Sequence, residues 1–207
     1  AELWDTIGGY HYDLAQYDEA LKAYEQAAAL WQQQADEVNR GQTLGSMGDT
    51  YKQLGQTEDA LRTYEEALPL ARAAADDKLT LRILQAQASL YQSAGQGEKA
   101  LAAYQDALAE AEKLGDVAGQ AAILQKQGDF YTDATQPAEA AALYQKAAEL
   151  WQSADEPAKA ADALVAAGDS YADTDQYPTA IALYQQAVDL AQAGQASDVV
   201  LAGYKQQ

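Results

Sequence analysis

Few residues in this chain of 207 could perform acid–base or nucleophilic chemistry. There is one histidine, His11, and no cysteine, so the chain has neither a thiol nucleophile nor a thiolate metal site. Histidine changes its charge near neutral pH and is the first candidate for a general base. At intervals of forty residues after His11 the chain has a tyrosine instead. This pattern favours a packed side chain over a catalytic one.

Two glycine-containing stretches resemble nucleotide-binding loops only weakly. The stretch SAGQGEKAL at 93–101 follows no predicted strand and lacks the Lys-Ser/Thr pair of a phosphate loop. The stretch GQTLGSMGD at 41–49 lies on a predicted helix, where close packing explains its glycines. Acidic pairs at 76–77 and 155–156 offer the oxygen ligands that Ca²⁺ prefers, but solvated turns explain them better. We therefore expect no cofactor, no metal site and no enzymatic activity.

The elements that position these residues repeat with a period of forty. One tyrosine series begins at Tyr51 and another at Tyr24; alanine series begin at Ala20 and Ala27, and a glutamine series at Gln16. The period predicts five units over residues 1–40, 41–80, 81–120, 121–160 and 161–200, followed by 201–207.

Apolar spacing within each unit predicts two helices. Trp4, Ile7 and His11 follow one face of a first helix, A, and Tyr24 and Trp31 follow one face of a second helix, B. We expect helix A over roughly positions 2–14 of each unit and helix B over roughly 17–34. Small residues at position 8 let the two backbones approach, while the tyrosines fill the gaps. The prediction is an all-α fold of five antiparallel hairpins.

The prolines and tryptophans support this arrangement, with one exception. Pro137 and Pro178 stand near the starts of B helices, and Pro157 near the start of the last A helix, where a missing amide is harmless. Pro69 lies well inside the second B helix and predicts a kink or an early loosening there. The expected core includes all three tryptophans, Trp4, Trp31 and Trp151.

These positions resemble the tetratricopeptide repeat family. Its signature is an aromatic residue or Leu at position 4, an apolar residue then Gly or Ala at 7 and 8, Tyr at 11, Ala at 20, an aromatic at 24 and Ala at 27. The units are about six residues longer than usual, and the proline that typically ends helix B is missing, so we expect a longer helix B. The resemblance implies one right-handed α-solenoid over 1–207, with A helices lining its concave side. The segment DVVLAGYKQQ at 198–207 is expected to open a partial capping helix.

The resemblance also assigns positions 2, 5, 9, 12 and 13 of each A helix to a concave groove. Per residue, these positions are about three times more negative than the whole chain. Tyr12 is their only aromatic residue and a candidate anchor. The charged groove candidates are Glu2, Asp5, Asp13, Asp49, Lys52, Arg82, Asp129, Asp133, Asp162, Asp169 and Asp173.

Two of these acids on each of the last two A helices form like-charge pairs four residues apart. The pairs Asp129–Asp133 and Asp169–Asp173 each cost roughly 0.2–0.5 kcal/mol, which favours a role in binding over one in stability. The alternative is an ordinary solvated surface in which position 9 bonds to the neighbouring helix. Position 5 contains no Lys or Arg, so we do not expect the family's clamp for a terminal carboxylate.

Charge and hydropathy limit the classes of partner. A net charge of −19 and a pI near 4.1 disfavour nucleic acid and anionic membranes and favour cationic partners. No apolar run is long enough to span a bilayer and no leader opens the chain, so a cytoplasmic location is expected.

The expected function is a non-enzymatic scaffold that binds a basic or mixed-charge segment of a protein partner in the acidic groove. One alternative is an array that self-associates through its ends or packs on a fused effector domain of a larger signalling protein. An unrecognised enzymatic site is the other alternative.

Overall fold

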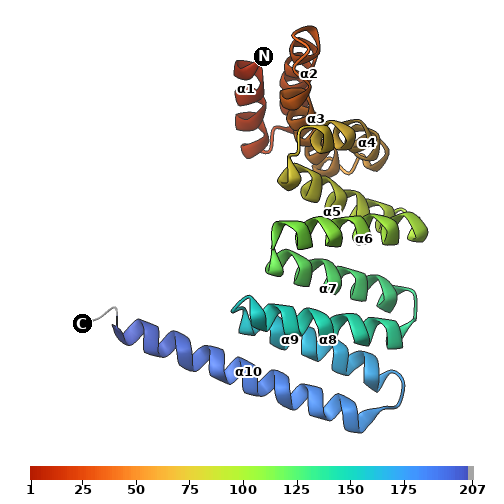
Figure 1. The fold of residues 1–207 in the computed structure, drawn as a ribbon, viewed down its shortest axis with the longest axis vertical. Helices are drawn as coiled ribbons and strands as arrows, with labels where there is room; N and C mark the ends of the chain where they lie inside the picture. Colours follow the sequence, from red (N-terminus) through yellow and green to blue (C-terminus); the bar gives the residue numbers. More distant parts are fainter. Residues whose placement is uncertain (205–207) are drawn as a thin grey trace. The chain divides into compact units, whose positions relative to one another are not determined.

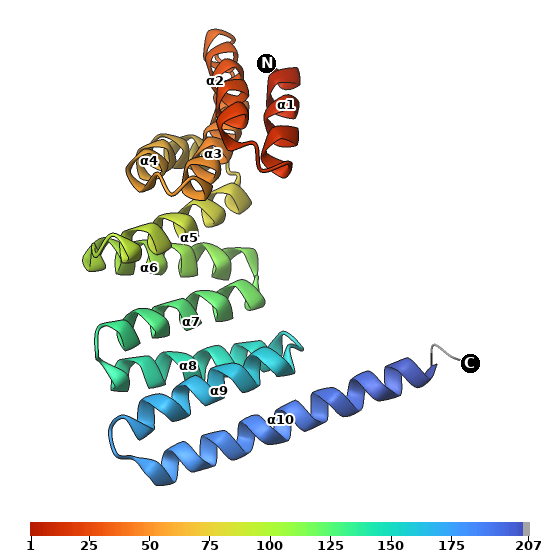
Figure 2. The same cartoon turned by 180° about the vertical axis from the view of Figure 1, so that it is seen from behind.

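The structure is a computed structural model that describes the backbone of residues 1–204 and the side chains of residues 1–193. All regular elements in that part of the chain are helices, which confirms the all-α fold and the five hairpins (Figures 1 and 2). The A helices are α1 (Glu2–Asp13), α3 (Glu37–Gln53), α5 (Asp77–Ser93), α7 (Val117–Asp133) and α9 (Pro157–Ala172). The B helices are α2 (Tyr17–Gln33), α4 (Thr57–Ala73), α6 (Gly97–Leu114), α8 (Pro137–Ser153) and α10 (Tyr177–Tyr204).

The helices group into two compact units. The first covers Ala1–Glu110 and the second begins at Ala111, so the division falls within α6. In the first unit each helix from α1 to α4 packs on the next, and α3 also contacts α5. In the second unit α7, α8, α9 and α10 pack in the same consecutive way. A single solenoid over the whole chain stays a prediction.

The later A helices begin earlier than the sequence predicts. α3 and α5 start at Glu37 and Asp77, five residues before the predicted starts at 42 and 82, so the predicted unit limits cut through these helices. The reason is N-capping: the Asp36 carboxylate accepts the Asn39 backbone N–H at 3.1 Å. This bond is also the main reason that the pKa of Asp36 is lowered. Aspartates in the same role cap α5 and α7, so the acids at these turns are caps rather than solvated loop charge.

The turns between helices use left-handed backbone. Glycine holds this conformation at Gly55, Gly95 and Gly115. Six other turns place a residue with a side chain there, for example Ala75 with a φ of 52°. A Cβ makes this conformation unfavourable, so these turns are maintained by the packing of the helices on either side.

Proline positions agree with the sequence except at Pro69. Pro137 and Pro157 are the first residues of α8 and α9, as expected for a residue without an amide hydrogen. Pro69 lies inside α4, which continues to Ala73, so the predicted early loosening is wrong. Ala67 and Ala71, on either side of Pro69, are buried, and this packing holds the last turns in place despite the missing backbone hydrogen bond.

The C-terminal prediction also needs correction. Residues from 198 to Tyr204 continue α10 without a break instead of opening a separate capping helix; residues 205–207 lie outside the described chain. Asp36, Asp76 and Asp116 cap the helices that follow the first three B helices, whereas the chain has Ala196 at the equivalent place, which offers no side chain that could cap a new helix. In the described part of the chain, no helix is both long enough and apolar enough to cross a bilayer.

The buried residues lie at the predicted repeat positions, except in the first turn of α1. Trp31 and Trp151 are buried, as expected, and so are Tyr64 and Tyr104. Trp4 is 42% exposed, so its prediction as a core residue is wrong. The residues at its place in the other A helices are buried leucines, because each of those helices follows a B helix.

We expect Tyr104→Ala to lower the free energy of unfolding by about 3–5 kcal/mol, because its fully buried ring would leave a cavity. Urea denaturation monitored by circular dichroism measures the change. Tyr104→Phe is the control: it keeps the ring but removes the hydroxyl, which donates to Gln92 Oε1 (2.8 Å), and should cost about 0.5–1.5 kcal/mol. Equal costs for the two variants would show that the ring does not fill the core.

We expect Ala75→Gly to raise the free energy of unfolding by about 0.5–1 kcal/mol, because glycine adopts positive φ without a steric penalty. The neighbouring variant Ala74→Gly is the matched control. Ala74 has a φ of −79°, so glycine there should destabilise the chain by a similar amount. Thermal melts of both variants test the difference, and shifts of the same sign would contradict it.

Candidate partner-binding groove

The groove candidates at position 9 are held by tyrosines from the following B helix. Tyr64 Oη donates to Asp49 Oδ1 (2.5 Å), Tyr144 Oη to Asp129 Oδ1 (2.9 Å) and Tyr184 Oη to Asp169 Oδ1 (2.6 Å). Each bond joins the two helices of one hairpin. These bonds offset the repulsion within the like-charge pairs, so Asp129 and Asp169 have a structural role whatever else they do.

The same contacts affect the ionisation of the tyrosines. Burial, followed by smaller contributions from the Asp129 hydrogen bond and nearby negative charge, raises the pKa of Tyr144 to about 12. Burial also raises the pKa of Tyr64. Both hydroxyls therefore stay protonated and remain donors across the physiological range.

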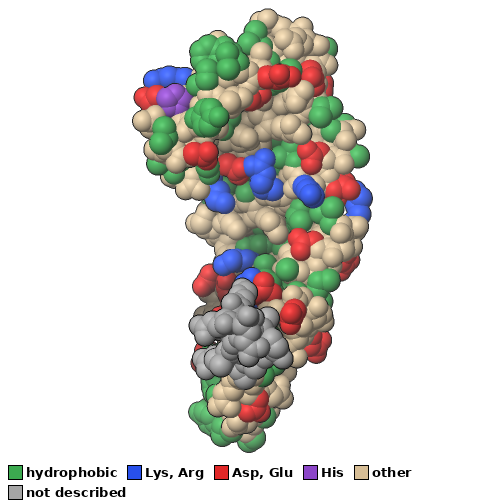
Figure 3. All heavy atoms as spheres, turned by 90° about the vertical axis from the view of Figure 1, so that its left-hand side faces the viewer, with side chains coloured by type: hydrophobic (Ala, Val, Ile, Leu, Met, Phe, Trp, Pro, Cys, Tyr) green, Lys and Arg blue, Asp and Glu red, His purple; other side chains and the backbone are tan. Residues whose placement is uncertain are grey.

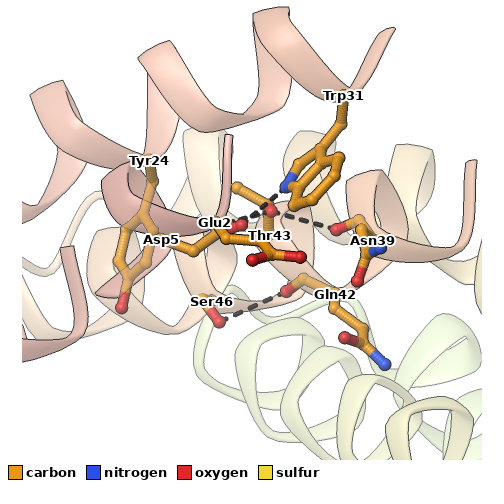
Figure 4. A pocket seen from close by; sticks show the side chains of 8 residues that line it. All are labelled: Glu2, Asp5, Tyr24, Trp31, Asn39, Gln42, Thr43 and Ser46. Atoms are coloured by element: carbon orange, nitrogen blue, oxygen red, sulfur yellow. Dashed lines mark hydrogen bonds between the residues drawn. The ribbon is translucent and has the colours of Figure 1, made fainter. Parts of the chain in front are cut away.

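In the first unit, Asp5 joins three helices. Its carboxylate accepts Trp31 Nε1–H from α2 at 2.6 Å and Thr43 Oγ1–H from α3 at 2.7 Å (Figure 4). Beside it is a pocket of about 310 Å³ that eight side chains line, among them Glu2, Asn39 and Ser46. Asn39 was not predicted to line a site, because the predicted start of this helix, at 42, comes after it.

The first unit also contains the basic groove candidates. Arg82 Nη1 donates to Asp49 Oδ2, which neutralises that carboxylate. Arg82 Nη2 lies close to Gly45, where an added Cβ would come within 2.9 Å of it. Lys52 is exposed on α3. The groove of the first unit is thus less negative than its acidic residues alone suggest.

Tyr12 lies near the end of α1, next to the turn that leads to α2. Its ring contacts Tyr17 of α2 edge to face, with centroids 5.5 Å apart. The side chain is half-buried, and the neighbouring Asp13 is exposed at the end of α1. Its role as a binding anchor stays a prediction.

The second unit has a continuous acidic face on α9. Asp162, Val165 and Asp169 on α9 and its C-cap residue Asp173, which keeps helical backbone, are all exposed. They follow one another at i, i+3, i+7 and i+11, so they share one side of the helix. We call these four residues the α9 face. None of the predicted groove positions in this unit carries Lys or Arg.

A hollow adjoins the α9 face. It has a volume of about 380 Å³, and Thr132, Thr135, Pro137, Ser170 and Asp173 line it. The hydroxyl groups make it polar, and Asp173 adds a carboxylate. The repeat pattern placed Thr132 at a groove position. It did not indicate Thr135 or Ser170, because these lie in the turn after α7 and on α9 and only folding brings them together.

Two other candidates lie on α7. Asp133 is exposed, and Asp129 is half-buried. The second oxygen of Asp129 accepts from Lys126 Nζ at 3.2 Å. Both partners of this ion pair are partly exposed, so it contributes little to stability.

Two protein-family models match the sequence of the chain. A tetratricopeptide repeat model matches residues 1–73 and 119–193, and a second tetratricopeptide repeat model matches residues 83–118. The chain belongs to the tetratricopeptide repeat family. This family is generally a non-catalytic scaffold for protein–protein interaction. No curated protein sequence matches the chain.

Several solved structures share this tetratricopeptide repeat fold. BtubC from P. vanneervenii is 18% identical over 93% of this chain and 80% of its own, with a TM-score of 0.78. MamA is 20% identical over 92% of this chain and 91% of its own, with a TM-score of 0.71. A Rap protein complexed with competence and sporulation factor is 19% identical, with a TM-score of 0.64; the match covers 93% of this chain and 54% of the Rap chain. At these identities the likeness shows the fold alone.

We expect the stability of this tetratricopeptide repeat array to fall as pH rises above 10. The pKa of Tyr144 is about 12 in the folded chain against an ordinary value of 10.0. The unfolded chain therefore loses this proton first, and unfolding becomes more favourable between those two values. Urea denaturation at several alkaline pH values measures the slope.

The double variant Tyr64→Phe/Tyr144→Phe should flatten that slope, because it removes two tyrosines with a raised pKa. Tyr10→Phe is the control, since Tyr10 is 67% exposed. A slope that Tyr10→Phe changes as much as the double variant would contradict the assignment to buried tyrosines.

Proposed function

We propose that this chain is a non-enzymatic scaffold whose second unit binds a basic or mixed-charge segment of a protein partner along the α9 face. The observation that carries the proposal is that three carboxylates and Val165 lie exposed on one side of α9, next to the hydroxyl-lined hollow. Family membership supports the general role, because tetratricopeptide repeats are generally interaction scaffolds.

The chemistry of the α9 face suits lysine and arginine. Carboxylates attract the charged ends of these side chains, while exposed Val165 offers an apolar surface for their aliphatic stems. The threonine and serine hydroxyls in the hollow donate to backbone carbonyls of the chain itself, so the oxygens that remain can accept hydrogen bonds from the backbone N–H groups of an extended segment. Tyr184 fixes the Asp169 carboxylate, so less side-chain freedom is lost when a partner binds.

The net charge makes other polymers poor partners. At −19 the chain repels nucleic-acid phosphates and anionic lipid headgroups. Asp169 and Asp173 are about 6 Å apart along the helix axis, within one Debye length at physiological salt, roughly 8 Å, so their fields add. Asp162 is about 10 Å from Asp169 along the axis, so its field is partly screened there. Attraction of a cationic segment should therefore be local and sensitive to salt.

The Rap neighbour supports a peptide-like or protein partner by analogy. That protein is described in complex with competence and sporulation factor, so one array of this fold holds a binding partner. Its identity to this chain is too low to transfer residues. The analogy therefore supports only the class of function, while the α9 face supplies the chemistry.

We expect Asp162→Asn/Asp173→Asn to slow association with a Lys/Arg-rich peptide by roughly three- to tenfold at low salt. These two aspartates are chosen because Asp129 and Asp169 also hold tyrosines, so their replacement would alter the fold as well as the charge. Stopped-flow fluorescence with a labelled peptide measures the association rate, and circular dichroism checks the fold.

Glu139→Gln/Glu149→Gln is the matched control, because it removes the same charge from exposed positions on the B helix α8. It should change the association rate much less, and the difference should shrink as salt rises. Equal rates for the two double variants would refute binding on the α9 face and leave it an ordinary solvated surface.

A further inference from the structure

The hollow beside the α9 face lies where three helix ends meet. In Figures 1 and 2 the turn that joins α7 to α8 and the turn after α9 are on the same side of the second unit. Thr132 comes from the last turn of α7, Pro137 is the first residue of α8, and Ser170 and Asp173 come from the end of α9. The volume of about 380 Å³ is at the lower end of the roughly 300–1,000 Å³ of ligand pockets, so the hollow suits one long side chain better than a larger ligand.

The hydroxyl groups that line the hollow offer acceptors rather than donors. Thr132 and Ser170 each donate to the backbone carbonyl four residues earlier, at 3.1 and 2.9 Å, and Thr135 donates to the carbonyl before it at 2.7 Å. Thr132 Oγ1 is also 3.2 Å from Tyr144 Oη, whose own hydrogen goes to Asp129, so the Thr132 hydrogen stays inside the chain either way. The three hydroxyl oxygens therefore keep only lone pairs for a ligand.

The rest of the lining favours a positive charge. The Asp173 carboxylate adds acceptors only. α7 and α9 both end here, and the carbonyl end of a helix carries a partial negative charge. α8 begins here with the opposite polarity, but its first residue, Pro137, has no amide hydrogen to donate. Among the described residues that line the hollow, none is Lys or Arg.

We propose that the hollow holds the ammonium group of one lysine side chain from the partner segment, an inference that rests on the proposed function of the α9 face. An ammonium has three N–H donors and no acceptor, whereas a backbone N–H supplies one donor. It can bond to the Asp173 carboxylate and to two of the hydroxyl oxygens at once. The long aliphatic stem of lysine brings the charge into the hollow while the backbone of the segment stays on the α9 face.

The arrangement of the acceptors selects lysine over arginine. A guanidinium is planar and suits the two parallel oxygens of one carboxylate. The acceptors here come from α7, the turn after it and the end of α9, so they surround the hollow from different directions. The three donors of an ammonium can point in such different directions, because the group rotates freely about its stem. Lysine is therefore bound more tightly than arginine at this one place.

Charge alone would not produce this preference. Acidic side chains are spread over the face of the molecule that Figure 3 shows, so a cation is attracted at many places. On an ordinary acidic surface arginine binds at least as well as lysine, because its planar fork can bond one carboxylate twice. A preference for lysine therefore distinguishes the hollow from general attraction.

Fluorescence anisotropy with the 207-residue chain tests the proposal. The probes are two labelled peptides of equal charge, one with lysine and one with arginine at every basic position. We expect the lysine peptide to bind about fivefold more tightly, which corresponds to about one additional hydrogen bond. Thr132→Val/Ser170→Ala removes two acceptor oxygens without changing the charge. It should weaken binding of the lysine peptide about tenfold and that of the arginine peptide less than about twofold, so the preference is lost.

Thr6→Val/Ser153→Ala is the matched control. It also removes one threonine and one serine hydroxyl that each donate to the carbonyl four residues earlier, but from exposed places outside the hollow. It should change neither affinity, and circular dichroism checks that both double variants fold.

The lysine site and the proposed function fail in different ways. Equal binding of the two peptides, or tighter binding of the arginine peptide, overturns the lysine site and leaves the α9 face as a surface for any basic segment. A lysine preference that survives Thr132→Val/Ser170→Ala, or that the control variant also abolishes, overturns the site as well. Failure of both peptides to bind overturns the proposed function together with this inference.

Discussion

The close approach of a tyrosine ring to a glycine determines the shape of every hairpin except the third, which has Ala88 at the place of the glycine. A Cβ added to Gly48 would lie 2.5 Å from Tyr64 Cε1, and one added to Gly128 would lie 2.6 Å from Tyr144 Cε1. The ring thus occupies the space that a side chain on the A helix would need. Because interiors are close-packed, this contact fixes how near the two helices lie and how the next hairpin packs on them.

The same ring brings its hydroxyl to the next residue of the A helix. Tyr64 and Tyr144 reach Asp49 and Asp129, one position after each glycine, and the buried ring leaves the carboxylate half-exposed. An acid at this place therefore satisfies a hydroxyl and also faces the groove. One carboxylate oxygen accepts from the tyrosine, and the second accepts from a basic side chain, Arg82 at Asp49 and Lys126 at Asp129.

The two units differ in how much of this negative charge remains available. In the first, Arg82 neutralises Asp49, and Asp5 uses its carboxylate to accept bonds from Trp31 and Thr43. In the second, α9 presents carboxylates on one exposed side without a basic residue at the groove positions. At the groove positions of the second unit, no basic residue therefore reduces the negative charge.

The sequence by itself determined the helices, their pairing and the family. Tyrosine, glycine and alanine repeat every forty residues because each hairpin buries the same face, and this signal survives without any structure. Helix starts were predicted less well: Asp36 and Asp76 cap their helices through local hydrogen bonds that apolar periodicity does not register. The repeat position of Trp4 predicts a buried side chain. Trp4 is exposed because, in the structure, no B helix packs on its side of α1.

Only the tertiary structure decided which acids are committed to the fold. Asp129 and Asp162 look alike as groove positions, yet Asp129 accepts a tyrosine hydroxyl from a residue fifteen positions away, while Asp162 is exposed on α9. The hollow beside Asp173 likewise combines residues from α7, the following turn and α9. Such contacts depend on distances between helices, which the side-chain packing of the whole hairpin sets and no local pattern encodes.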